Sequence, residues 1–401
     1  MHILQIMKWI SSMEDTGGKI RSFRIGRALS TFAQVDAAGF VLPGDRPDGN
    51  CDHLSHYQRL FPLPICRGAV AAGAALKAFA GGLSLRTGRF FPAVFSSFMK
   101  DIVPPGRYDA IQVEELPLMS AVRGCFPDTP VIYSSHNVES ALSPDLFARR
   151  NILLRQIAGI EAGRTLVEEQ KAMARSCACL AVSEHDRDAL VGLAGGCKTP
   201  GYVLPNCAQD RFQPGPPAGS DAALLTTGSF GWYPNREGLF WFVDEIMPLL
   251  KREIPSLRIH VAGSGIDFRF RRILSRKGIR VYPDVPDMLP FLQGARLLFV
   301  PLRIGAGTRI KILEAWAAGL PVVSTSCGAD GLNGRPDGDI LIADDAASFA
   351  RAMRAVYQDD RLYARLRSEG LNRAQSLRWS SLAGPLKNIY ADILRGAGAK
   401  P

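Results

Sequence analysis

The sequence lacks the features that mark disulfide-rich, membrane-spanning or nucleic-acid-binding proteins. Its eight cysteines are scattered without a C-x-x-C spacing, which argues against a disulfide framework and a zinc site and favours a reducing compartment. No apolar run is long enough to span a bilayer, and MHILQI at the start has the pattern of a strand rather than a secretion signal. No basic run with interleaved aromatic residues occurs, so nucleic acid is not an expected partner. We therefore expect a globular, cytoplasmic protein.

The 401 residues are enough for two domains of ordinary size. Short apolar runs alternate with segments of helical period almost throughout, which is typical of parallel sheets covered by helices. The predicted fold class is α/β, with two doubly wound sheets. Strands are expected near residues 2–6, 35–42, 109–113, 130–134, 178–182 and 201–204 in the first half, and near 222–228, 257–262, 279–282, 296–301, 320–324 and 339–342 in the second.

A stretch without apolar period separates the two halves. It reads NCAQDRFQPGPPAGSDA, and its prolines and glycines favour a linker at residues 207–221. The N-terminal domain would then cover residues 1–206 and the C-terminal domain residues 222–378. Ligands of open α/β sheets bind outside the carboxyl ends of the strands, so functional residues are expected on loops that face a cleft between the domains.

The net charge and one apolar segment indicate what the surface of the protein could bind. The formal net charge is +10, and most of the excess lies in the C-terminal half, where anionic ligands are therefore expected. Residues 65–98 are rich in small apolar side chains but are interrupted by Arg67, Lys77, Arg86 and Arg89. This segment fits either buried helices of the first domain or an amphipathic surface that meets a membrane or a lipid-linked acceptor.

The stretch VPLRIGAGTRIKILEAWAAGLPVVST, residues 300–325, has the pattern of an anion site. A buried strand leads into a turn in which Gly305 and Gly307 permit positive φ. Thr308 can cap a helix that is expected to begin at Arg309. The unpaired N–H groups of such a helix N-terminus favour phosphate.

Three charged residues of this helix extend the site. Arg309 and Lys311 would add two positive charges beside the phosphate, and Glu314 lies on the face of Lys311, one turn deeper. A carboxylate there can accept two hydrogen bonds from a vicinal diol such as a ribose. On spacing alone, an ordinary Lys–Glu surface pair beside a glycine turn remains an alternative.

This stretch resembles the donor-binding motif of the retaining GT-B glycosyltransferases of family 4, in the branch that reads G-x-G-T-R-x-K-x-L-E. The resemblance covers nearly the whole chain, since GGKIRSF, SSHNVES, AVSEHDRDAL, LPNCAQDRFQP and TGSFGWYPNREG resemble the landmarks of this family in their usual order. It implies two Rossmann-like domains and a last helix, residues 379–397, that crosses back to the N-terminal domain. It also implies transfer of a hexosyl or other glycosyl group from a nucleotide diphosphate sugar, with retention of configuration and without a metal or other cofactor.

The resemblance further implies roles for single residues. Those expected to bind the donor are Gly17, Gly18, Gly228, Ser229, Val285, Gly305, Ala306, Gly307, Thr308 and Glu314. Those expected to act in catalysis are His136, Arg309 and Lys311. Those expected to contact the acceptor or to orient His136 are Glu114, Glu115 and Asn137, although a solvated loop end fits Glu114 and Glu115 equally.

The chain departs from the family pattern at two places. Many members carry a glutamate eight residues before the position of Glu314, where this chain has Ala306. Many also carry an Arg–Lys pair after the first strand of the second domain, where this chain has Ser229 and Glu237. We hypothesise that Arg309 and Lys311 supply the charge missing from that loop.

The expected mechanism is front-face attack assisted by the leaving phosphate, because no pair of carboxylates at loop ends suits a two-step reaction. Asp337-Gly338-Asp339 matches a metal-binding string but reads as a turn before a strand. The expected partners are a nucleotide-sugar donor and an acceptor such as a lipid-linked saccharide in polysaccharide or glycolipid assembly, with peripheral contact to the inner face of the membrane. Two alternatives stay open: a sugar-nucleotide 2-epimerase, and a catalytically silent scaffold that binds anionic surfaces.

Overall fold

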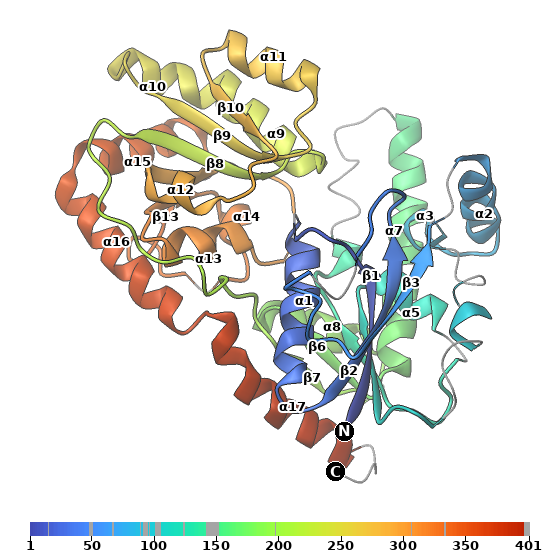
Figure 1. Ribbon diagram of the computed structural model, residues 1–401. Helices are drawn as coiled ribbons and strands as arrows, with labels where there is room; N and C mark the ends of the chain where they lie inside the picture. Colours follow the sequence, from blue (N-terminus) through green and yellow to red (C-terminus); the bar gives the residue numbers. More distant parts are fainter. Residues whose placement is uncertain are drawn as a thin grey trace. The chain divides into compact units, whose positions relative to one another are not determined.

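The computed structural model describes residues 1–14, 16–47, 51–65, 68–88, 90, 95, 97–100, 106–122, 125–141, 152–196, 198–305, 307–332 and 334–396. The chain forms two compact units (Figure 1): unit 1 comprises Met1–Pro205 and Leu382–Pro401, and unit 2 comprises Asn206–Ser381. Ala306, which we predicted to contact the donor, lies outside the described residues. Among the described residues, no helix has both the length and the hydropathy to cross a membrane.

Unit 1 contains a parallel sheet with the strand order β3-β2-β1-β4-β5-β6-β7. Its strands are β1 (His2–Trp9), β2 (Gln34–Val41), β3 (Arg59–Pro64), β4 (Ala110–Glu114), β5 (Val131–Ser134), β6 (Ala178–Ala181) and β7 (Gly201–Val203). We did not predict β3, whose sequence RLFPLP contains two prolines. Proline cannot donate to a strand neighbour, and β3 accommodates it because it is the edge strand.

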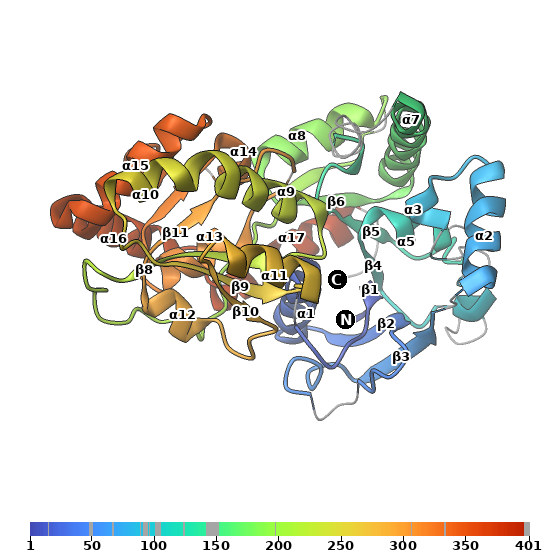
Figure 2. The same ribbon diagram turned by 90° about the horizontal axis from the view of Figure 1, so that it is seen from above.

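Helices cover both faces of this sheet (Figure 2). The helices of unit 1 are α1 (Gly17–Ser30), α2 (Gly68–Ala80), α3 (Leu85–Gly88), α5 (Leu116–Ala121), α7 (Ile152–Arg175), α8 (Glu184–Leu193) and α17 (Ala383–Gly396). Although α17 is the last helix of the chain, it packs beside α1, where the rings of Phe32 and Tyr390 lie 5.9 Å apart. The C-terminal segment thereby completes unit 1.

Unit 2 contains a parallel sheet with the order β10-β9-β8-β11-β12-β13. Its strands are β8 (Ala223–Ser229), β9 (Ile259–Ser264), β10 (Arg280–Pro283), β11 (Ala295–Val300), β12 (Val322–Ser324) and β13 (Leu341–Ile342). Side chains of β11 alternate between two cores, with Leu297 and Phe299 in one and Leu298 and Val300 in the other. All of the predicted strands occur, and the prediction of two doubly wound α/β sheets is confirmed.

The helices of unit 2 lie between successive strands, and the last three follow β13. They are α9 (Tyr233–Trp241), the π-helix η1 (Phe242–Ile246), α10 (Met247–Glu253), α11 (Phe268–Arg276), α12 (Leu289–Gln293), α13 (Ile310–Ala317), α14 (Ser326–Ala329), α15 (Ala346–Gln358), α16 (Asp360–Gln375) and the 3-10 helix η2 (Trp379–Leu382). Residues 207–221, which we predicted to be a linker, belong to unit 2 and contribute the buried ring of Phe212 to its core.

The interpretation of residues 65–98 as buried helices is wrong for α2. None of its described side chains is buried, and Leu76 is 66% exposed. At the end of the helix, Arg164 of α7 stacks 3.7 Å from the ring of Phe79 and donates to the carbonyl oxygen of Leu83. Small apolar side chains gave α2 a core-like composition without enough bulk to fill a core.

Candidate active site

In unit 2, the end of β8 lies beside the N-terminus of α13. The ammonium group of Lys311 donates to the carbonyl oxygen of Thr227 and, at 3.0 Å, to Asn235 Oδ1. A Cβ atom on Gly228 would lie only 2.7 Å from Lys311 Nζ, and the φ of +151° at Gly228 also favours glycine. The absence of a side chain at Gly228 therefore leaves space for the ammonium group of Lys311, which comes from the connection that follows β11.

Arg309 lies in the glycine turn before α13. Its backbone is extended at the N-cap position, and the helix begins at Ile310. Its guanidinium group donates to the carbonyl oxygen of Gly307 at 2.9 Å and lies 5.9 Å from the ring of Trp232. A Cβ atom on Gly305 would overlap this guanidinium group, so the turn requires glycine there.

The prediction that Thr308 caps the helix is wrong. Thr308 Oγ1 accepts a hydrogen bond from Asn206 Nδ2 at 2.6 Å, which ties the turn to the first residue of unit 2. The helix starts one residue later than this cap would place it, with Arg309 as the N-cap and without a side-chain hydrogen bond at that cap.

Electrostatics distinguish Lys311 from a surface lysine. The pKa of Lys311 is lowered to about 7, mainly by burial and also by the charge of Arg309, whereas Glu314 acts in the opposite direction. Part of the side chain reaches solvent, but the ammonium group lies deep between β8 and α9. The two hydrogen-bond acceptors of this ammonium group are a carbonyl oxygen and an amide oxygen, and neither is a carboxylate. An anion bound here would therefore contact an available cation, which argues against the alternative of an ordinary Lys–Glu surface pair.

The remaining predicted residues of unit 2 lie on the carboxyl side of the strands. The carbonyl oxygen of Ser229 accepts from Asn235 Nδ2 at 2.8 Å, and the half-buried Glu314 is on α13. Val285 follows β10, two strands away from β8, and is partly exposed. Glu237 forms an ion pair with Arg303.

In unit 1, the end of β4 and the loop after β5 bring three predicted residues together. His136 Nε2 lies 3.0 Å from Glu114 Oε2, and His136 Nδ1 lies 4.0 Å from Glu115 Oε1. Glu115 takes a φ of +71°, which is costly for a residue with a side chain and directs its carboxylate to Lys8 at 3.1 Å. A Cβ atom on Gly18 would lie 3.7 Å from His136 Nδ1, so Gly18 borders the same site.

Gly17 and Gly18, which we expected to bind the donor, are the first two residues of α1. The N-terminus of α1 therefore lies at the carboxyl edge of the sheet, beside Glu115 and His136. Asn137 follows His136 and is half-buried, and its carbonyl oxygen accepts from Ser135 Oγ at 2.6 Å.

Glu114 is fully buried, and its two oxygens are held differently. Oε2 faces His136, whereas Oε1 accepts from Gln5 Nε2 at 2.8 Å and from Gln112 Nε2. Burial alone would raise the pKa of Glu114, but the hydrogen bond and charge of His136 and the charge of Arg21 bring it below its ordinary value. An ionised carboxylate can only accept, so His136 Nε2 carries a proton and donates.

Two tyrosines extend this network beneath the site. Tyr57 Oη donates to Gln5 Oε1 at 2.7 Å, and Tyr390 Oη, on α17, donates to Gln112 Oε1. Burial raises the pKa of both tyrosines well above the ordinary value, so both stay protonated donors. Each tyrosine thereby orients one glutamine amide so that its N–H points at Glu114.

Several site residues were not predicted. Asn235 and Trp232 lie in the TGSFGWYPNREG landmark, but only the fold shows that they lie beside Lys311 and Arg309, respectively. Gln5 and Tyr390 lie 385 positions apart in the chain, and no local pattern could join them to Glu114. The signal that was available is a polar residue inside an apolar strand, as at Gln5 in MHILQI.

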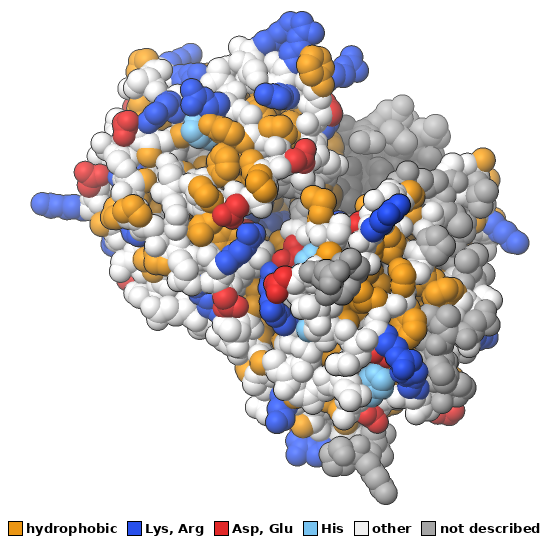
Figure 3. Space-filling model, viewed as in Figure 1, with side chains coloured by type: hydrophobic (Ala, Val, Ile, Leu, Met, Phe, Trp, Pro, Cys, Tyr) orange, Lys and Arg blue, Asp and Glu red, His pale blue; other side chains and the backbone are white. Residues whose placement is uncertain are grey.

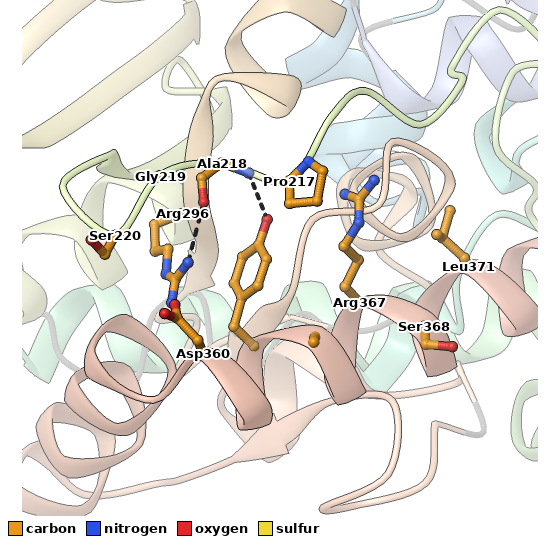
Figure 4. A pocket seen from close by; sticks show the side chains of 11 residues that line it. Pro217, Ala218, Gly219, Ser220, Arg296, Asp360, Arg367, Ser368 and Leu371 are labelled. Carbon is orange, nitrogen blue, oxygen red and sulfur yellow. Dashed lines mark hydrogen bonds and ion pairs between the residues drawn. The ribbon is translucent and has the colours of Figure 1, made fainter.

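A pocket of about 540 Å³ in unit 2 lies at a different place (Figure 4). It is lined by residues of α16 and of the segment that precedes β8. Arg296 donates to the carbonyl oxygen of Ala218 at 3.2 Å and Tyr363 Oη accepts from the N–H of Ala218 at 3.0 Å. These contacts fasten the segment to β11 and α16, and none of the predicted site residues lines the pocket.

The fold class follows from solved structures that align along nearly the whole chain. Sucrose-phosphate synthase from Thermosynechococcus elongatus aligns with a TM-score of 0.70 and 16% identity, over 98% of this chain and 99% of that one. HepE from Anabaena, solved with UDP-glucose, aligns with a TM-score of 0.65 and 14% identity, over 98% and 100%. The chain thus has the GT-B fold of two parallel-sheet α/β domains, as predicted.

The sequence comparisons cover parts of the chain. Residues 221–359, which lie in unit 2, match the family model described as glycosyl transferases group 1. An uncharacterised 44.6 kDa protein in the cps region of Klebsiella pneumoniae is 26% identical over 136 residues, which are 32% of this chain and 35% of that protein. The D-inositol 3-phosphate glycosyltransferase of Rhodococcus opacus is 24% identical over 289 residues, 65% of this chain and 61% of that protein. The matched regions span about a third to three fifths of these relatives.

Proposed function

We propose that the chain is a glycosyltransferase that moves a sugar from a nucleotide diphosphate sugar to an acceptor hydroxyl. The observation that carries this proposal is the buried ammonium group of Lys311, held by Thr227 and Asn235 at the N-terminus of α13. Helix N–H groups and two cations on one sheet edge suit a diphosphate. The group 1 match and the UDP-glucose complex of HepE support the same class of donor.

The two units divide the work in this proposal. In unit 2, Lys311 and the N–H groups of α13 hold the diphosphate, Glu314 holds the ribose hydroxyls, and Val285 packs against the base. In unit 1, His136 contacts the sugar through Nδ1, since Nε2 is engaged by Glu114. Arg309 supports the diphosphate site from the glycine turn.

The reaction retains the anomeric configuration. The bond from C1 of the sugar to the diphosphate oxygen breaks, and C1 bonds to the acceptor oxygen on the same face. The acceptor hydroxyl loses its proton to a phosphate oxygen of the leaving diphosphate. Lys311 and α13 stabilise the negative charge that grows there, as preorganised positive groups do. No metal is required, because these groups neutralise the diphosphate.

The acceptor is a lipid-linked saccharide in the assembly of a polysaccharide or glycolipid, met at the inner face of the membrane. The similarity to a protein in the cps region supports this role. The net charge of +10 also favours contact with an anionic surface.

A donor panel tests the proposal. Thermal shift and calorimetry with the diphosphate sugars of uridine, guanosine, thymidine and adenosine should show binding of at least one, beginning with the uridine series. Transfer should proceed with a chelator present, and proton NMR should show the product with the donor's anomeric configuration. Release of nucleotide only when acceptor is present excludes the epimerase. Absence of binding to every donor would support the silent scaffold instead.

A further inference from the structure

Helix α11 of unit 2 carries an unusual surface. Its sequence, FRFRRILSR, contains four arginines and no acidic residue, and Lys277 follows it. Phe270 and Leu274 face the core, and the other side chains are exposed. Phe268 is 77% exposed, which is more than any other large hydrophobic residue among the described ones, and Ile273 is 44% exposed. Figure 3 shows Lys and Arg side chains gathered with hydrophobic ones over α11.

The positive charge of this surface is not neutralised locally. Arg269, Arg271, Arg272, Arg276 and Lys277 form no ion pair with any described residue. The acidic residue that precedes the helix is already engaged, because Asp267 accepts from the N–H of Phe270 and from Arg236.

Neighbouring elements add further cations to this surface. Lys251 Nζ lies 3.5 Å from the carbonyl oxygen of Lys277, and Arg280 at the start of β10 is exposed. Seven positive side chains, from three elements, thus share this part of unit 2 with two exposed apolar ones. We name this set of nine residues the α11 surface: Lys251, Phe268, Arg269, Arg271, Arg272, Ile273, Arg276, Lys277 and Arg280.

We propose that the α11 surface docks on an anionic lipid bilayer. Clusters of four to eight Lys and Arg residues on a helix are attracted to anionic headgroups. An exposed aromatic ring among them is stabilised at the boundary between headgroups and acyl chains. The surface is a convex helix rather than a groove, and single-stranded nucleic acid is usually held in grooves.

The location of α11 fits this role. Arg236 of α9 donates to the carbonyl oxygen of Phe230, at the end of β8, and to Asp267 at the start of α11. Phe268 is therefore at the carboxyl edge of the sheet, the same edge as Lys311. Docking through the α11 surface would hold the proposed donor site close to an acceptor that is anchored in the membrane.

The other candidate surface is α2, which is exposed and apolar. Lys77 is the only charged residue among its thirteen. Electrostatic attraction to headgroups contributes roughly the same amount for each cation, so it favours α11 over α2. The two helices therefore provide a matched pair for the experiment.

The experiment measures flotation of the full chain with phosphatidylcholine vesicles, with and without phosphatidylglycerol. The chain should bind only the anionic vesicles, and high salt should release it. Phe268→Ser/Arg272→Glu should weaken binding by at least about 20-fold, since each cation contributes about fivefold. Leu76→Ser/Lys77→Glu on α2 should bind as the unchanged chain does. Arg272→Gln alone provides a milder variant, and the melting temperature and donor binding of each variant check its fold.

Three results would overturn the proposal. The unchanged chain could fail to prefer anionic vesicles, or the α2 variant could lose binding while the α11 variant keeps it. A single-stranded oligonucleotide could also bind more tightly than the vesicles and lose its binding in the α11 variant, which would assign the surface to nucleic acid. Vesicle binding does not require transfer, so each of these results is distinguishable from failure of the proposed function.

Discussion

The two units wind their sheets in the same order, yet they place opposite chemistry at the carboxyl edges. In unit 1, His136 meets the carboxylates of Glu114 and Glu115, and buried side chains donate to Glu114 from below. In unit 2, Lys311 meets a backbone carbonyl and an amide oxygen, with Arg309 as a second cation nearby. The same scaffold therefore supports an oriented imidazole in one unit and a partly neutralised cation in the other.

The two sites differ in whether their buried charge is balanced in the absence of a ligand. The charge of Glu114 is balanced by the hydrogen bonds of His136, Gln5 and Gln112, so this site is complete without a ligand. The pKa of Lys311 is lowered by burial and by Arg309, so this site gains when an anion arrives. We therefore expect changes in unit 1 to alter turnover and changes in unit 2 to alter donor affinity.

The largest effect is expected for His136→Ala. Removing a group that touches the reacting sugar should lower kcat by about 100-fold. The affinity for the nucleotide diphosphate should change little, because unit 2 is intact. Steady-state kinetics and calorimetry separate the two quantities, and His185→Ala, an exposed histidine on α8, is the control. A loss of donor affinity equal to the loss of kcat would contradict the division of roles.

Lys311→Met should show the reverse pattern. The loss of a charged hydrogen-bond donor to the diphosphate should weaken donor binding by about 10- to 30-fold. Calorimetry with the best donor of the panel measures this change, and Lys277→Met is the control because Lys277 is exposed in the same unit. If the affinity were unchanged, the idea that Lys311 replaces the charge missing from the β8 loop would be wrong.

The sequence predicted the fold better than the sites. Apolar runs located the strands, since burial on both faces of a parallel sheet leaves a continuous signal. We did not predict the edge strand β3, because its two prolines are more typical of a loop than of a strand. Glycines and charges pointed to Gly228, Arg309 and Lys311, but Thr308 was misread as a cap because Asn206, a hundred residues away, engages its hydroxyl group.

The buried support of His136 could not be predicted at all. Gln5 is a polar residue inside an apolar strand, but no local pattern joins it to Gln112 or Tyr390. Only the fold brings β1 beside β4 and α17 beneath them. A residue that positions another side chain, rather than contacting the substrate, can be recognised only from the folded structure.

The pH dependence of donor binding tests the state of Lys311. A bound diphosphate should raise the pKa of Lys311 above its value of about 7 in the free chain, so binding should take up a proton. Affinity for the nucleotide diphosphate sugar should be highest below pH 7 and fall by about tenfold as the pH rises by one to two units above it. Calorimetry in buffers of different ionisation enthalpy counts the proton.

The same group affects stability with the opposite sign. Between the folded pKa of about 7 and the ordinary lysine pKa of 10.5, the unfolded chain holds a proton that the folded chain lacks. The contribution of Lys311 to the free energy of unfolding therefore rises with pH across this window. Lys311→Met should remove both trends, and an unchanged pH profile of affinity in that variant would assign the titration to another group.

The smallest effect is expected for Tyr390→Phe, which removes one hydroxyl group far below the site. Without its donor, the amide of Gln112 is no longer fixed with its N–H towards Glu114, and His136 loses part of its orientation. We expect kcat to fall about fivefold, the scale of one buried hydrogen bond, with donor affinity unchanged. Tyr202→Phe is the matched control, because Tyr202 also donates to a residue of α17, Asp392 at 3.4 Å, without leading to Glu114. Nitrogen-15 NMR of the imidazole should show Nε2 protonated in the unchanged chain and in the control, and a shifted tautomer balance in Tyr390→Phe. Equal spectra and equal kcat in all three would mean that the tyrosine stabilises α17 and does not position His136.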